Sequence, residues 1–130
     1  MPAVSQIALV VFDWAGTTVD HGRQAPVTAF VRTFAAHNVS VTPAEARGPM
    51  GLPKREHLLS MLRLPSVADR WRQAHGRDWN EVDVATLYNF FMPCQLEVLD
   101  RYSALVPGVL DSVSRLRKQH IRIGATTGYF

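Results

Sequence analysis

Two short apolar runs predict the strands of this chain. Residues 7–12 are apolar at every position, which is the pattern of a parallel strand buried on both faces. The pattern of residues 121–125 predicts a second strand. Just before it, apolar residues spaced by four and three mark one side of a helix over 109–120. A strand, a long helical segment, a helix and a strand together are typical of an α/β fold.

The long segment between the strands has the pattern of several helices. Thr42 and Glu45 have the spacing of a capping box, in which each side chain bonds the backbone of the other residue. A last long helix is expected over 81–102, where Pro93 should kink or divide it. The other residues that suit helix starts are Pro26, Pro53 and Ser66.

This pattern predicts three segments. Residues 1–20 form the first core strand and its loop, 21–103 a helical cap, and 104–130 a core helix with the second strand. Two strands are too few for a parallel sheet, which needs neighbouring strands and covered faces. We therefore expect an incomplete Rossmann-like core with an inserted α-helical cap, the N-terminal part of a larger protein.

Composition narrows the functional classes. The 130 residues are 47% apolar and 19% charged, which indicates a globular chain. The net charge of +3 comes from scattered arginines without a basic run, so we expect no nucleic-acid partner. The longest apolar run is too short to span a membrane, and no membrane partner is expected. Cys94 is the only cysteine, which excludes an internal disulfide and favours a cytoplasmic location.

The first strand ends at a residue that suits phosphoryl chemistry. Ligands of open α/β sheets bind at the carboxyl ends of strands, where Asp13 stands before a turn at Gly16. An aspartate there can attack phosphorus, but its charge beside an anionic substrate must be offset, and Mg²⁺ suits this task. Asp13 and the backbone carbonyl of Ala15 are the expected metal ligands. The alternative is that Asp13 only caps a turn.

Lys54 is the candidate for amine chemistry. It follows Pro53 in a predicted first helical turn, where the helix dipole disfavours a further positive charge. Partial burial under a cap would act in the same direction and favour the neutral amine that attacks aldehydes. His57 lies three residues later, on the same helix face. Alternatively, both side chains are ordinary surface residues. The other lysine, Lys118, has no expected role.

Three motifs in this order resemble those of a known family. The string DWAGTTVD at residues 13–20 resembles the first motif of the haloacid dehalogenase-like superfamily, and PMGLPKREH at residues 49–57 resembles the cap motif of its phosphonatase family. The resemblance implies that Lys54 forms a Schiff base and that Met50 and His57 line the site. The string TTGY at residues 126–129 is similar to the second motif. It implies that Thr127 and Gly128 bind the phosphoryl group and that Tyr129 lines the pocket or packs nearby. By itself, this string also reads as a turn that caps a helix.

The resemblance implies hydrolysis of the P–C bond of phosphonoacetaldehyde to acetaldehyde and phosphate, in phosphonate catabolism. Most phosphatases of the superfamily have an acid where Ala15 stands, and an imine on Lys54 would make that acid unnecessary. The family's third and fourth motifs are not in this chain, so we expect it to be inactive alone and a homodimer when full length. The alternatives are a related phosphatase or phosphomutase using Asp13 and Mg²⁺, or a non-catalytic fragment.

Overall fold

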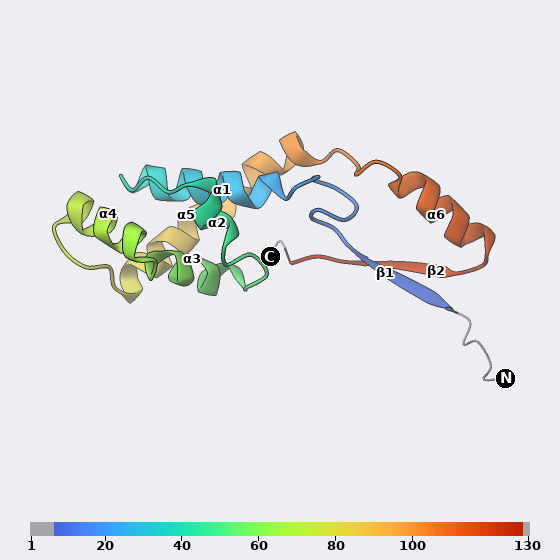
Figure 1. Ribbon diagram of the computed structural model, residues 1–130, viewed down its shortest axis with the longest axis horizontal. Helices are drawn as coiled ribbons and strands as arrows, with labels where there is room; N and C mark the ends of the chain where they lie inside the picture. The colour runs from blue at the N-terminus through green and yellow to red at the C-terminus, as the bar shows by residue number, and fades with distance from the viewer. Residues whose placement is uncertain (1–6, 129–130) are drawn as a thin grey trace.

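The computed structural model describes residues 7–128 and has an elongated shape (Figure 1). Helices fill one end of the molecule, and a two-stranded sheet with one helix fills the other. The elements in chain order are β1 (Leu9–Asp13), α1 (Gln24–Ala36), α2 (Pro43–Arg47), α3 (Lys54–Leu62), α4 (Pro65–His75), α5 (Glu81–Leu99), the 3₁₀ helix η1 (Asp100–Tyr102), α6 (Val109–Lys118) and β2 (Arg122–Thr126).

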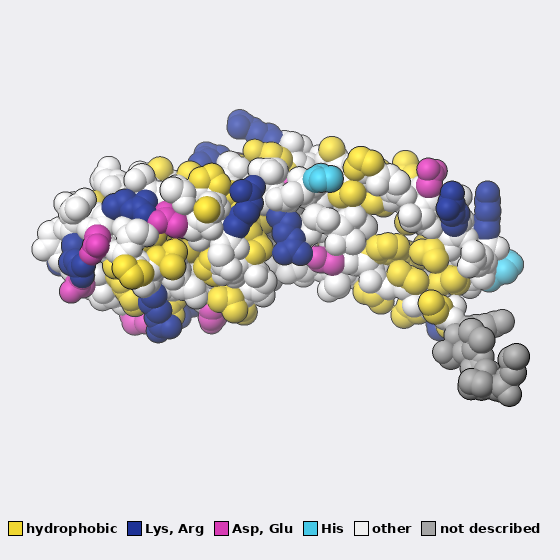
Figure 2. All heavy atoms as spheres, in the orientation of Figure 1, with side chains coloured by type: hydrophobic (Ala, Val, Ile, Leu, Met, Phe, Trp, Pro, Cys, Tyr) yellow, Lys and Arg dark blue, Asp and Glu magenta, His cyan; other side chains and the backbone are white. Residues whose placement is uncertain are grey.

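Strands β1 and β2 pair in parallel, with Asp13 opposite Thr126 at their carboxyl ends. The predicted parallel pair is therefore confirmed. The prediction that residues 7–12 are buried on both faces is wrong for this structure, because the side chains of Leu9 and Val11 are 48% and 54% exposed. Within residues 7–128 each strand has one neighbour, and α6 packs beside β2. Figure 2 shows exposed apolar side chains gathered over this end of the molecule.

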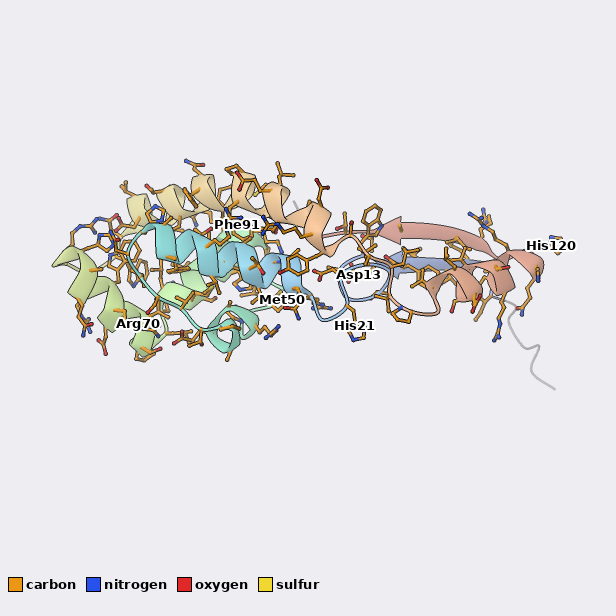
Figure 3. The ribbon with its side chains drawn as sticks, turned by 90° about the horizontal axis from the view of Figure 1, so that it is seen from above. Asp13, His21, Met50, Arg70, Phe91 and His120 are labelled. Carbon is orange, nitrogen blue, oxygen red and sulfur yellow. The ribbon has the colours of Figure 1, made fainter. Side chains whose placement is uncertain are left out.

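The helical part has its own apolar core. Helix α1 packs along α5, and α3 packs against α5. The ring of Phe30 stacks on Phe91 from α5, with the centroids 4.4 Å apart, and on His57 from α3, with the centroids 3.8 Å apart. Phe91 lies between the helices in Figure 3. Other fully buried core residues are Phe34, Leu58, Met61, Leu62, Val67 and Leu87.

One of the expected helix caps is present in the structure, and another is not. The capping box is confirmed: the Glu45 amide donates to the Thr42 hydroxyl at 3.1 Å, and the Thr42 amide donates to the Glu45 carboxylate at 2.8 Å. A helix does begin beside Ser66, since α4 starts at Pro65, but Ser66 lies inside the first turn and does not cap it. The Ser66 hydroxyl instead donates to Glu45 at 2.6 Å, which joins α4 to α2.

Pro93 does not divide the last long helix. Helix α5 continues through it from Glu81 to Leu99, and a short 3₁₀ helix follows. A proline inside a helix removes one backbone hydrogen bond and crowds the preceding turn. Here Phe91 and Cys94 are buried on either side of Pro93, so both halves of the helix are anchored in the core.

The state of the lone cysteine and the character of the helices can be compared with the expectations from composition. Cys94 is buried and its thiol is free, as expected for a lone cysteine. Over residues 7–128, none of the helices has both the length and the apolar character that crossing a membrane requires.

Candidate active site

The loop after β1 folds around one carbonyl oxygen. The Trp14 oxygen accepts hydrogen bonds from the amides of residues 17–19, at 3.0 to 3.1 Å. Gly16 has a φ of 79°, in the left-handed region that glycine adopts without steric cost. This turn reverses the chain directly after the strand. Asp13 is therefore held at the carboxyl end of β1, at the junction of the two parts of the molecule (Figure 3).

Asp20 ties this loop to the helical part. Its side chain is 3% exposed, and its two carboxylate oxygens accept hydrogen bonds from the amides of Gln24 and Ala25 at 2.7 and 2.9 Å. These amides belong to the first turn of α1, which otherwise has no side-chain cap. The last residue of the DWAGTTVD motif thus fixes the direction in which α1 leaves the loop.

The second strand ends beside the first. Thr126 pairs with Asp13, so the chain that follows β2 leaves the sheet next to the expected nucleophile. Thr127 and Gly128 follow directly, and Gly128 lines the cavity described below. Tyr129 lies outside the described residues. The roles predicted for Thr127 and Tyr129 stay predictions.

A cavity of about 570 Å³ lies between the sheet end and the helical part. Residues from several segments line it: Asp13 and Ala15 from the loop, Met50 from the turn before α3, Lys54 from the start of α3, and Gly128 after β2. Asp13 and Met50 lie close to the same junction in Figure 3. The structure therefore brings the carboxylate of Asp13 and the amine of Lys54, which are far apart in the sequence, to one cavity.

Lys54 has the environment expected of a reactive amine. It is the first residue of α3 and is half-buried, with Pro53 in the N-cap position. Burial lowers the pKa of its ammonium group below the ordinary value of 10.5, and the nearby positive charge of Arg23 lowers it further. Both effects increase the fraction of neutral amine at a given pH. The predicted location of Lys54 in a first helical turn is confirmed.

His57 lies elsewhere than we expected. It is fully buried in the helical core and does not line the cavity. Its Nε2 donates to the carbonyl oxygen of Ala46 at 2.7 Å, and its ring stacks on Phe30. Burial lowers its pKa to about 4; the hydrogen bond to Ala46 opposes this shift, and the charge of Lys54 adds to it. A direct role in the site stays a prediction that this arrangement does not support.

The cavity lining also includes residues that no sequence motif indicated, and two of them bear on its chemistry. Arg23 precedes α1, and Tyr88 belongs to α5; both line the cavity. Arg23 has a φ of 54°, and this left-handed turn carries its side chain back over Gly16. Its position three residues after the DWAGTTVD motif was the available signal. Tyr88 gave no signal, because an aromatic residue on a helix usually belongs to the core.

The residues present fit part of a metal site. Among residues 7–128, no three acidic, histidine or cysteine side chains lie close enough to hold an ion. The cavity does contain the Asp13 carboxylate next to the backbone of Ala15. The Trp14 carbonyl is occupied by three amides, whereas no described donor bonds the Ala15 carbonyl. Oxygen ligands of these two kinds suit Mg²⁺, and further ligands would have to come from outside the described residues.

The chain matches no protein-family model but is similar to curated proteins. The phosphonoacetaldehyde hydrolase of Paraburkholderia phytofirmans is 47% identical over 126 residues, which are 97% of this chain and 47% of that protein. The chain is related to the phosphonoacetaldehyde hydrolases. That of Pseudomonas fluorescens strain SBW25 is 48% identical, over 92% of this chain and 44% of its own length. The chain spans about half the length of the curated relatives it matches.

Solved structures agree with this relationship. A phosphonoacetaldehyde hydrolase-like protein from Oleispira antarctica superposes with a TM-score of 0.89 at 42% identity, over 95% of this chain and 45% of that one. A predicted phosphoglycolate phosphatase from Haemophilus somnus has a TM-score of 0.73 at 17% identity, which shows a shared fold alone. The predicted α/β class and the resemblance to phosphonoacetaldehyde hydrolases are confirmed. The chain corresponds to about half of such a protein.

Proposed function

We propose that these residues supply the nucleophile and the amine of an enzyme that hydrolyses phosphonoacetaldehyde to acetaldehyde and phosphate. The observation that carries the proposal is that Asp13 and Lys54 line one cavity while Ala15 stands in the loop position of the usual acid. An aldehyde bound by Lys54 would lie within the same cavity as the carboxylate that attacks its phosphorus. The relatives that match the chain support the same reaction.

The reaction begins with the neutral amine of Lys54. It condenses with the aldehyde, which forms a C=N bond and releases water. An oxygen of Asp13 then forms a bond to phosphorus while the P–C bond breaks. The electron pair of the broken bond passes into the protonated imine and gives an enamine. Protonation at carbon and hydrolysis release acetaldehyde and restore Lys54. Water then hydrolyses the aspartyl phosphate and releases phosphate.

The absent acid at position 15 follows from this chemistry. In a phosphatase the leaving group is an alkoxide, which an acid in the loop protonates. Here the electrons of the P–C bond enter the imine, so no alkoxide leaves and a carboxylic acid has nothing to protonate. We propose that Met50 lines the aldehyde end of the cavity and that Thr127 and Gly128 bind the phosphonate oxygens, as hydroxyls and amides do in oxyanion sites. Tyr129 is proposed as a further lining residue.

We propose Mg²⁺ as the cofactor, held in part by the Asp13 carboxylate and the Ala15 carbonyl. When bound, the ion would reduce the repulsion between Asp13 and the anionic phosphonate. The remaining ligands are expected from a segment that the longer relatives have and these residues do not include. Asp13 itself must present one oxygen to phosphorus, and the turn at Gly16 keeps the carboxylate at the edge of the sheet.

The wider organisation of the protein is also a proposal. Residues 21–103 would act as a cap that closes over the cavity, and 1–20 with 104–130 would belong to the core. The exposed apolar side chains of Leu9 and Val11 support a core that further strands complete. We propose that the complete enzyme is a homodimer in the cytoplasm and that these residues alone have little activity.

The test is phosphate release from phosphonoacetaldehyde by an intact enzyme that contains these residues. Lys54→Arg and Asp13→Asn should each lower turnover by about three orders of magnitude, a loss typical of removing a covalent catalyst. Lys118→Arg is the matched control, because Lys118 is exposed in the last turn of α6. Undiminished turnover in Lys54→Arg would contradict the proposal. Faster release from simple phosphate monoesters would favour a phosphatase instead.

A further inference from the structure

Arg23 brings a positive charge to the lining of the cavity. Among residues 7–128, no ion pair is formed by its side chain. Arg55 lines the same cavity, but its guanidinium pairs with Glu81 at 2.5 Å. An unpaired guanidinium beside a cavity keeps its hydrogen-bond donors available to an anionic ligand.

The side chain of Arg23 is positioned by the nucleophile loop itself. Its amide donates to the carbonyl oxygen of Asp20 at 2.9 Å, and its backbone adopts the left-handed conformation, with φ 54° and ψ 49°. The side chain then crosses Gly16 so closely that a Cβ at Gly16 would lie 2.8 Å from Cγ and 3.1 Å from Nε of Arg23. A non-glycine residue enters this conformation at a free-energy cost, so the rest of the turn must hold it there.

The other charges around the cavity suit an anion. Arg23 is close enough to Lys54 for its positive charge to disfavour the charged form of the Lys54 amine. In the proposed reaction Lys54 is a cation again once it carries the protonated imine, and two cations held near each other are stabilised when a dianion lies between them. A phosphonate group has that charge, and its oxygens match the planar donor fork of an arginine.

We propose that the Arg23 guanidinium binds the phosphonate oxygens of the substrate, as an anion-binding residue supplied by the turn between β1 and α1. This inference rests on the proposed function for the identity of the substrate. It assigns to the turn before α1 a direct contact with the phosphonate group, in addition to the contact of Lys54 with the aldehyde. Arg23 would then orient phosphorus towards Asp13, which lines the same cavity.

The test uses methylphosphonate, which has the anionic group without the aldehyde. Its dissociation constant for the intact enzyme is measured by isothermal titration calorimetry. Arg23→Met keeps the aliphatic chain over Gly16 and removes the charge, so binding should weaken about tenfold or more. Arg23→Lys keeps the charge and should lose about threefold. Arg63→Met removes a positive charge at the far end of α3 and should bind like the wild type.

A purely structural role predicts a different pattern. If Arg23 only packs against Gly16, Arg23→Met would bind methylphosphonate as tightly as the wild type, and that result would overturn the inference. Absence of measurable binding by the wild type would overturn it as well. Failure of the proposed function is detected separately, by absence of phosphate release from phosphonoacetaldehyde in the wild-type enzyme. Circular dichroism of each variant confirms that the comparison is made between folded proteins.

Discussion

The buried histidine of α3 should make the stability of the helical part depend on pH. The pKa of His57 is lowered from 6.5 to about 4 in the folded chain, mainly because burial disfavours the charged ring. The unfolded chain therefore takes up a proton at a higher pH than the folded chain. The stabilisation is complete above pH 6.5 and is lost as the pH falls towards 4. From about pH 7.5 to about pH 5, the loss is about 2 kcal/mol.

The assay is urea-induced unfolding followed by tryptophan fluorescence, since Trp71 is 2% exposed in the core. His57→Gln is the comparison, because glutamine does not titrate and its amide can still donate to the Ala46 carbonyl. The free energy of unfolding of the wild type should fall by about 2 kcal/mol more than that of the variant over this range. Equal pH dependence in the two proteins would refute the account of His57 as a buried neutral ring.

Glu45 titrates outside this window. Burial raises the pKa of its carboxyl, but hydrogen bonds from Ser66 and Thr42 and the charge of Arg70 together lower it to about 2. Because this pKa is lowered from 4.5, the stabilisation by Glu45 is present above pH 4.5 and is lost below it. A measurement that ends at about pH 5 therefore reports on His57 with little contribution from Glu45.

Four further predictions concern other residues. The yield of borohydride-trapped imine on Lys54 should reach its half-point below pH 10.5, because burial lowers the pKa of its amine; a half-point at or above that value would contradict this. Gly16→Ala should destabilise the protein by about 1–3 kcal/mol in urea unfolding, because its φ is 79° and the new Cβ would lie 2.8 Å from Arg23; an unchanged midpoint would count against the described turn. Glu45→Gln should lower the free energy of unfolding by about 1–2 kcal/mol, because Glu45 completes the capping box, accepts a hydrogen bond from Ser66 and pairs with Arg70. Glu97→Gln, which removes an exposed ion pair, should cost less than about 1 kcal/mol in the same assay.

Local signals allowed much of this structure to be predicted from the sequence. The apolar run before Asp13, the proline before Lys54 and the Thr42–Glu45 spacing each depend on neighbours within a few residues. Such features fold in the same way in most surroundings. They were sufficient to place Asp13 at a strand end and Lys54 at a helix start, and the sheet pairing then places Thr126 beside Asp13.

Features that depend on distant contacts were not predictable in this way. His57 does share a helix with Lys54, but its surroundings are set by Phe30 and Ala46 from other segments, so it became a core residue. Arg23 reaches the cavity because a left-handed turn folds its side chain over Gly16, and no local sequence pattern indicates that approach. Leu9 and Val11 of β1 are exposed because burial of a strand needs neighbouring elements, which periodicity alone does not provide.

The proposed reaction depends on an imine at Lys54, which allows Asp13 to break the P–C bond. The most direct measurement is borohydride reduction of the intact enzyme during turnover of phosphonoacetaldehyde, followed by mass spectrometry of its peptides. The account predicts an N-ethyl group on Lys54, from reduction of the imine left after the P–C bond breaks, and none on Lys118. Phosphate release without any modification of Lys54 would contradict it.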